Sequence, residues 1–140
     1  MSHKYTAAVK VTGEGRNGGH ARSDDGLLDT DLSLPRELGG AGTATNPEQL
    51  FAAGWSACFL GAVRLAASER KVRLTSTEID TDVTLDHGGD GFSLSAVLNL
   101  KVGGITQAEA EDLAHAAHQI CPYSKATRGN IPVTINAFAV

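Results

Sequence analysis

Two cysteines are the residues of this chain whose type and surroundings could do chemistry. Cys58 lies in the run 46–59, and Cys121 opens the run 121–131. Two thiols far apart in a small chain are either inert core residues or a reactive cysteine and the partner that resolves it. The thiolate is the nucleophilic form of a cysteine, and a free thiol with a pKa of about 8.5 is only about 3% ionised at pH 7.

Cys58 would react only if a cation lowered the pKa of its thiol. It lies about three turns into a predicted helix, too deep for the dipole at that helix's N-terminus to act on it. Arg16, in the glycine-rich run 13–19, is the candidate cation, and Glu48 is a carboxylate on an otherwise apolar helix. An Arg16–Glu48 pair would hold the guanidinium with its other donors pointed at the sulfur. The alternatives are a surface arginine, a glutamate at a helix start, and Cys58 as a small core residue.

The spacing of Glu48 and Cys58 limits how such a site is built. The two residues are ten positions apart, which on a straight helix is about 15 Å of rise. Either the helix breaks near Gly54, or one of the two residues meets groups from a second subunit. We favour a site assembled at the two-fold interface of a dimer.

Cys121 stands before Pro122 at the predicted end of a second helix, because a proline disfavours helical conformation in the residue before it. A short backbone shift is easy at such a place. That suits a resolving thiol, which must reach a sulfenic acid on Cys58. The alternative is an apolar residue that ends a helix, and the separation of the two cysteines along the chain does not decide between them.

Length and composition indicate one globular domain, residues 1–140, or half of an obligate dimer. The formal net charge of −4 argues against nucleic acid or an anionic membrane as a partner. The longest apolar stretch, 50–67, contains Gly54, Ser56 and Arg64 and falls short of a clean membrane span. The start of the chain has no signal-peptide pattern. We therefore expect a cytoplasmic protein, in which free thiols suggest transient redox chemistry.

Hydrophobic periodicity predicts the elements that must position these residues. Predicted strands cover 5–11, 21–23, 28–34, 79–86, 92–102 and 132–140, and predicted helices cover 46–70 and 106–120. Asn46, Pro47 and Glu48 favour the start of the first helix, and Thr106 with Glu109 forms a capping box at the start of the second. The fold class is α+β, with antiparallel sheets packed around long central helices in the order β-β-β-α-β-β-α-β and no βαβ rhythm. The first helix is apolar on nearly every side, so it should be buried all round. One subunit of this size covers such a helix poorly, so we expect a partner chain.

The runs 46–59 and 121–131 resemble the two signature motifs of the organic hydroperoxide resistance (Ohr) proteins of the OsmC/Ohr superfamily. The runs 35–40 and 15–18 are similar as well, so the resemblance covers essentially the whole chain. The resemblance implies an intertwined homodimer with two sites at its interface.

The same resemblance implies an enzyme, a thiol peroxidase that reduces organic hydroperoxides, lipid hydroperoxides included, to alcohols. By motif, Cys58 is then the peroxidatic cysteine, Cys121 the resolving one that forms a Cys58–Cys121 disulfide, and Arg16 and Glu48 the activating pair. It further implies reduction by dihydrolipoyl groups, as dihydrolipoamide or on a lipoylated protein, with no bound cofactor. Trp55 stands where we would expect a tyrosine.

Four apolar residues are predicted to line a channel for the alkyl tail of the substrate: Leu38, Phe51, Trp55 and Phe59. For the aromatic residues among them, ordinary core positions are the alternative. His115, His118 and Cys121 have the spacing of ligands on one helix face, but no second Cys/His pair completes a zinc site, and we expect no metal. The remaining alternative function is a thiol redox sensor or regulatory binding module without turnover.

Overall fold

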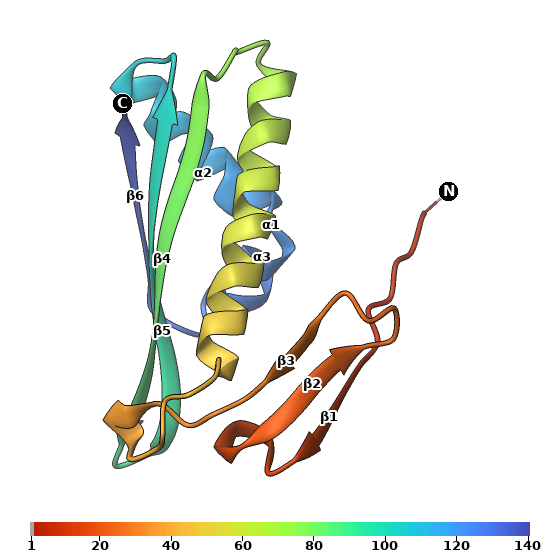
Figure 1. Ribbon diagram of the computed structural model, residues 1–140. Coiled ribbons are helices and arrows are strands. Elements are labelled where there is room, and N and C mark those ends of the chain that lie inside the picture. The colour runs from red at the N-terminus through yellow and green to blue at the C-terminus, as the bar shows by residue number, and fades with distance from the viewer. Residues whose placement is uncertain (1) are drawn as a thin grey trace. The chain divides into compact units, whose positions relative to one another are not determined.

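The computed structural model describes residues 2–140, and Figure 1 shows its helices and strands. The chain divides into two compact units, Met1–Leu50 and Phe51–Val140, and the boundary falls within the first long helix. The units are described in turn. The assignment of residues 1–140 to a single domain stays a prediction.

The first unit contains a three-stranded antiparallel sheet in the order β1-β2-β3, as the alternating pattern predicts. Its strands are β1 (Val9–Gly13), β2 (Gly19–Ser23) and β3 (Asp29–Asp31), and a 3-10 turn, η1 (Gly15–Asn17), joins β1 to β2. The strand predicted over 5–11 begins later, at Val9, because β2 supplies pairing partners only for Val9 to Gly13. A second 3-10 turn, η2 (Arg36–Leu38), lies in the long loop that follows.

Helix α1 (Pro47–Glu69) begins as predicted. The side chain of Asn46 accepts a hydrogen bond from the backbone N–H of Gln49 at 2.9 Å, which is the bond of an N-cap. Pro47 occupies the first helical position, where its missing N–H costs nothing, and Glu48 lies in the first turn, where the helix dipole favours a negative charge. Lys71, with φ of 55°, follows the end of the helix in the left-handed region.

The sheet of the second unit has the order β4-β5-β6. Strands β4 (Ser76–Gly88) and β5 (Gly91–Gly103) form a long hairpin. Strand β6 (Val133–Ala139) then pairs with β5 in parallel, which the antiparallel prediction missed. The reason is the crossover of α2 (Gln107–Ile120) and α3 (Pro122–Thr127), which returns the chain to the end of the sheet from which β5 starts. The α+β class and the predicted element order are confirmed, with α3 as a short addition.

Helices α1 and α2 cover the sheet of the second unit (Figure 1). Helix α2 starts with the predicted capping box, in which Thr106 accepts from the N–H of Glu109 and Glu109 accepts from the N–H of Thr106. The core between helices and sheet contains the following buried residues: Trp55, Phe59, Ala62, Val63, Ala96, Leu98, Leu100, Val102, Ala110, Ala114, Ala117 and Cys121.

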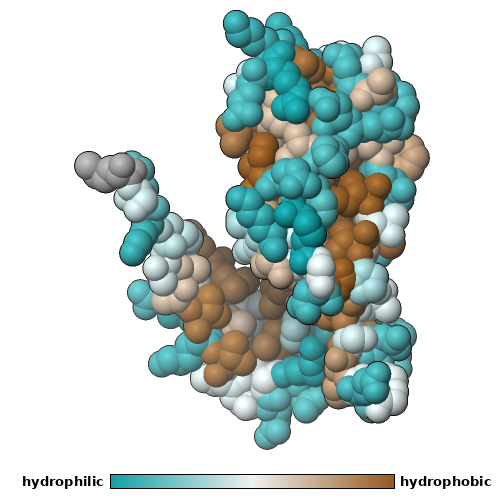
Figure 2. All heavy atoms as spheres, turned by 180° about the vertical axis from the view of Figure 1, so that it is seen from behind, coloured by the Kyte–Doolittle hydropathy of each residue, from teal (hydrophilic) through white to brown (hydrophobic). Residues whose placement is uncertain are grey.

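Apolar side chains also reach the surface, where Figure 2 shows them in brown. Among the large exposed ones are Tyr5, Val9, Val11, Leu27, Leu65, Phe92 and Phe138. Single exposed apolar residues are ordinary in folded proteins. Strand β1 differs because all five of its residues are exposed.

Candidate functional site

The two thiols meet in the second unit. The Cys121 thiol donates toward the sulfur of Cys58, with 3.0 Å between the sulfur atoms. Both cysteines are free, Cys121 being fully buried and Cys58 partly buried. Residues that are 63 positions apart in the sequence are therefore direct neighbours. The resolving role of Cys121 stays a prediction.

Cys121 forms the corner between α2 and α3. Its own N–H donates to the carbonyl of Ala117, which ends α2, and its carbonyl accepts from the N–H of Lys125, which begins α3. The residue adopts an extended conformation, φ −61° and ψ 121°, as the proline that follows it requires. Pro122 is thus the local reason why the chain turns at the thiol.

Helix α3 contacts α1 at two further places that the sequence did not reveal. A Cβ placed on Gly54 would lie 3.3 Å from Cε2 of Tyr123, so the absence of a side chain at Gly54 leaves room for the Tyr123 ring. The indole N–H of Trp55 donates to the hydroxyl of Ser124 at 3.2 Å, and both residues are fully buried. A buried tryptophan usually has a hydrogen-bond acceptor, so a tryptophan on an apolar helix is the signal in the sequence from which a polar partner could have been predicted.

The surroundings of Cys58 within the second unit do not by themselves favour a thiolate. Burial raises the pKa of the Cys58 thiol, and the neighbouring Cys121 thiol raises it further. The backbone of Tyr123, in the first turn of α3, acts in the opposite direction and lowers the pKa of the Cys58 thiol. A lowered pKa, which the sequence predicts, therefore requires a cation in addition to these groups.

The predicted Arg16–Glu48 pair forms within the first unit. Nη1 of Arg16 donates to Oε2 of Glu48 at 3.0 Å, and Nη2 donates to Oε1 at 2.6 Å. This two-bond arrangement is the strong geometry for an arginine and a carboxylate. The Arg16 side chain is 37% exposed and that of Glu48 15%. A guanidinium has five N–H donors, so three remain available on Arg16 after these two bonds.

Helix α1 is continuous from Pro47 to Glu69 and passes through Gly54 without interruption. The alternative in which the helix breaks near Gly54 is therefore wrong, because the backbone hydrogen bonding of a helix tolerates a glycine. The other alternative, in which a second subunit contributes to the site, stays a prediction.

The four residues predicted to line a substrate channel are placed differently from one another. Trp55 and Phe59 are fully buried in the core of the second unit, the alternative that the sequence left open for the aromatic residues. Phe51 is half-buried and its ring lies 5.4 Å from that of Trp55, while Leu38 is exposed. A role for these four residues in holding the substrate stays a prediction.

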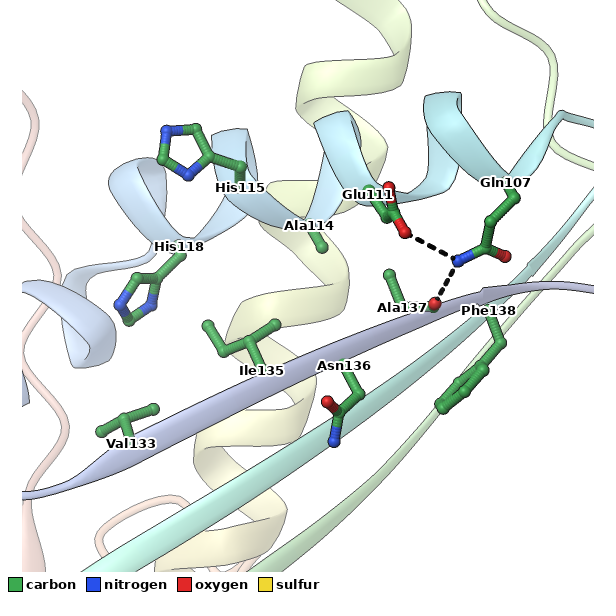
Figure 3. Close-up of a pocket in the computed structure, with 10 residues that line it drawn as sticks. All are labelled: Gln107, Glu111, Ala114, His115, His118, Val133, Ile135, Asn136, Ala137 and Phe138. Carbon is green, nitrogen blue, oxygen red and sulfur yellow. Dashed lines mark hydrogen bonds between the residues drawn. The ribbon is translucent and has the colours of Figure 1, made fainter.

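The two histidines of α2 belong to a different place. His115 and His118 line a pocket of about 620 Å³ between α2 and β6, together with Glu111 (Figure 3). Figure 3 also shows Gln107 of α2 bonded to the backbone of β6. Burial lowers the pKa of His118, and its Nδ1 is buried without a hydrogen-bond partner. Cys121 does not line this pocket. Within residues 2–140, no group of three or more His, Cys, Asp or Glu could hold a metal ion.

Helix α1 is long and apolar enough, by length and composition, to cross a membrane. In the structure, Trp55, Phe59 and Val63 of this helix are fully buried and pack against the sheet of the second unit. That is the place of a core helix.

Comparison with known proteins gives a consistent result. Residues 40–136 match the family model described as OsmC-like protein. An organic hydroperoxide resistance protein from Xanthomonas axonopodis pv. citri is 50% identical over 133 residues, which are 94% of this chain and 92% of the relative. Organic hydroperoxide resistance protein OhrB from Bacillus subtilis is 44% identical over 91% of this chain and 94% of the relative.

Solved structures agree with the sequence comparisons. A crystal structure of an organic hydroperoxide resistance protein from Legionella pneumophila matches with a TM-score of 0.92 at 44% identity, over 99% of this chain and 100% of that one. The crystal structure of OhrB from Bacillus subtilis matches with a TM-score of 0.84 at 43% identity, over 94% of this chain and 97% of that one. A family model that covers most of the chain and relatives of this identity lead to one conclusion: the chain belongs to the OsmC-like family.

Proposed function

We propose that this protein is a thiol peroxidase that reduces organic hydroperoxides, including lipid hydroperoxides, to alcohols in the response to oxidative stress. The observation that carries the proposal is the 3.0 Å contact between the free thiols of Cys58 and Cys121. Two cysteines on different elements make such a contact in a chain whose relatives are named for organic hydroperoxide resistance. An inert core cysteine would require no second thiol beside it.

In the proposed reaction, the thiolate of Cys58 attacks the distal peroxide oxygen. An S–O bond forms, the O–O bond breaks, and the leaving alkoxide takes a proton to become the alcohol. Cys58 is then a sulfenic acid. The sulfur of Cys121 attacks this sulfenic sulfur, an S–S bond forms, and the hydroxyl leaves as water with the proton of the Cys121 thiol. The contact of the two sulfur atoms supports the second step because little movement separates the thiols from a disulfide.

Arg16 is the proposed cation of the site. Burial and the Cys121 thiol raise the pKa of Cys58, so the reaction requires a group that favours the charged form of the sulfur. An arginine cannot lose its charge, and the two hydrogen bonds that Arg16 donates to Glu48 hold the guanidinium in one orientation with three donors free. The same cation would stabilise the negative charge that develops on the leaving oxygen.

A dithiol of the dihydrolipoyl type, free or on a lipoylated protein, is the proposed reductant. It would reduce the Cys58–Cys121 disulfide by thiol–disulfide exchange and leave as the cyclic lipoyl disulfide, so that no cofactor stays bound. Such recycling belongs to a reducing compartment, and the cytoplasm is the proposed location.

We further propose a homodimer. All residues of β1 are exposed, including Val9 and Val11, and Leu65 is exposed on α1, although all three are apolar. Within residues 2–140, β1 pairs only with β2, and β4 pairs only with β5, so each of these strands has one open edge. Open edges and exposed apolar side chains are the features that a second copy would cover. Light scattering on the purified protein would give the mass of a dimer if this proposal is right.

The function is tested by mixing the reduced protein with cumene hydroperoxide and excess dihydrolipoamide and following the loss of peroxide. We expect many turnovers for the unchanged protein and no peroxide loss above background for Cys58→Ser. Without dihydrolipoamide, Cys121→Ser should consume about one equivalent of peroxide per subunit and then stop, because its sulfenic acid has no resolving thiol. A redox sensor would instead consume about one equivalent in the unchanged protein, which would refute the enzyme while keeping the thiol chemistry.

A further inference from the structure

The contact between the two thiols depends on how α3 lies against α1. Helix α3 is a single short element of six residues, and short helices are marginal on their own. Its place is therefore decided by tertiary contacts. Three positions of α1 supply some of these contacts: Gly54 faces the Tyr123 ring, Trp55 bonds to Ser124, and Cys58 meets Cys121.

Among these three contacts, the Trp55–Ser124 bond is the hydrogen bond that does not involve the thiols. Both residues are fully buried, and the bond is 3.2 Å long. If α3 moved away, the buried indole N–H would lose its acceptor, and an unsatisfied buried donor is unfavourable. A hydrogen bond requires a particular distance and angle, so this bond restrains both the position and the orientation of α3. Apolar packing is non-directional and does not restrain orientation in this way.

Ser124 is also tightly connected to Cys121. The carbonyl of Cys121 accepts from the N–H of Lys125, the residue after Ser124, within one turn of helix. The carbonyl of Ser124 in turn accepts from the N–H of Arg128 and from the Thr127 hydroxyl. A restraint on Ser124 therefore restrains the backbone of Cys121, three residues earlier.

We propose that the Trp55–Ser124 hydrogen bond is a clamp that positions Cys121 against Cys58 and thereby sets how readily the two sulfurs form a disulfide. The peroxidase role of this clamp rests on the proposed function. Ser124 is a positioning residue, because it acts through Cys121. A thiol held beside its target has a high effective concentration, and freedom of α3 would lower it. The shift from 3.0 Å to a disulfide of about 2.05 Å is small enough for the clamp to persist in both states.

The clamp has a consequence for damage by excess peroxide. The sulfenic acid on Cys58 has two fates: the Cys121 thiol attacks it with loss of water, or a second hydroperoxide oxidises it to sulfinic acid with release of an alcohol. The first rate depends on the position of Cys121, and the second depends on peroxide concentration. Loss of the clamp should therefore lower the peroxide concentration at which half of Cys58 becomes sulfinic acid.

The test compares the unchanged protein with Ser124→Ala, Trp55→Phe and the matched control Ser56→Ala. Ser56 is adjacent on α1 and donates to the hydroxyl of Thr81 at 2.7 Å, on β4 and not on α3. The first measurement is the equilibrium constant of the Cys58–Cys121 disulfide in glutathione buffers, which uses no peroxide. We expect Ser124→Ala and Trp55→Phe each to lower this equilibrium constant about fivefold, which corresponds to about 1 kcal/mol. The constant of Ser56→Ala should stay within about twofold of that of the unchanged protein.

The second measurement follows, by mass spectrometry, the fraction of Cys58 converted to sulfinic acid as the cumene hydroperoxide concentration rises. In Ser124→Ala, half conversion should occur at about fivefold less peroxide than in the unchanged protein. Equal disulfide constants for Ser124→Ala and the unchanged protein would overturn the clamp, and so would an equal loss in Ser56→Ala. Absence of any disulfide in glutathione would overturn it too. If the disulfide forms in glutathione but no hydroperoxide is consumed, the peroxidase proposal fails while the first measurement still decides the clamp.

Discussion

The Arg16–Glu48 pair allows a prediction whose size follows from its geometry. A double-mutant cycle with Arg16→Ala, Glu48→Ala and the double variant would isolate the coupling free energy between the two side chains. Fully exposed ion pairs contribute about 0.2–1 kcal/mol, and shielded hydrogen bonds to charged groups about 1.5–3 kcal/mol. Arg16 is 37% exposed and Glu48 15%, and two hydrogen bonds join them. We therefore expect a coupling of about 1 kcal/mol, between these limits.

The chain offers a matched control pair for this cycle. Nε of Arg70 donates to Oδ2 of Asp112 at 2.8 Å, and the Arg70 side chain is also 37% exposed, but that of Asp112 is 60% exposed and one bond joins the pair. The Arg70–Asp112 coupling should be only about 0.3 kcal/mol, as for other exposed pairs. Arg70 also donates to the carbonyl of Ala66, and the cycle cancels that contribution because it is lost in both Arg70 variants.

Urea unfolding of all variants, at one protein concentration and neutral pH, would supply the free energies. Raising the salt concentration should reduce the Arg70–Asp112 coupling by the larger fraction, because exposed charges are screened more than partly buried ones. A coupling at Arg16–Glu48 no larger than that of the control would refute the reasoning. It would mean that the carboxylate does not hold the guanidinium in place, and the proposed activating role of Glu48 would fail with it.

Two further predictions concern the first unit. Both ring nitrogens of His20 lie at carboxylates, Nδ1 at 2.7 Å from Asp31 and Nε2 at 2.5 Å from Asp29, and the hydrogen bonds to Asp31 and then to Asp29 raise the pKa of His20. The stabilisation by protonated His20 is fully present below about pH 6.5 and is lost as pH rises through the pKa of the folded state. His20→Gln should therefore lower the free energy of unfolding in urea more at pH 6 than at pH 9. An equal loss at both pH values would contradict this prediction. A Cβ on Gly19 would lie 2.2 Å from the carbonyl oxygen of Thr12, so Gly19→Ala should lower the free energy of unfolding by about 1–3 kcal/mol. The control Gly88→Ala has nothing within 4 Å of its Cβ and should change this free energy by less than about 0.5 kcal/mol. Equal urea midpoints for the two variants would contradict the prediction.

The parts of the fold that depend on neighbouring residues were predictable from the sequence. Asn46, Pro47 and Glu48 predicted where α1 begins, and Thr106 with Glu109 predicted the start of α2, because a helix start is decided by the few side chains that satisfy its free N–H groups. The end of α2 at Cys121 followed from Pro122 for the same local reason. The pairing direction of β6 was not predictable in this way, since it depends on where a crossover of two helices returns the chain.

In the candidate site, too, the residue types were predictable from the sequence and the contacts between them were not. The types and local motifs of Cys58, Cys121, Arg16 and Glu48 were sufficient to identify them as candidates, since reactive thiols and paired charges are chemically distinctive. Their sequence separations did not determine contacts, because contacts over 32 positions for Arg16–Glu48 and 63 for the two thiols depend on how whole elements pack. Ser124 shows the limit most clearly. A lone serine has no distinctive local pattern, and only the packing of α3 on α1 brings its hydroxyl to the indole of Trp55.

By itself, therefore, the sequence determined the chemical inventory of this protein, the order of its strands and two long helices, and the residues at which α1 and α2 start and α2 stops. These are local properties, decided by side-chain chemistry and by backbone preferences within a turn or two. The tertiary structure alone decided that two thiols meet at 3.0 Å, that β6 runs parallel to β5, and that α1 continues unbroken through Gly54. Those features arise from burying apolar faces and satisfying buried polar groups across the fold, which no short stretch of sequence determines.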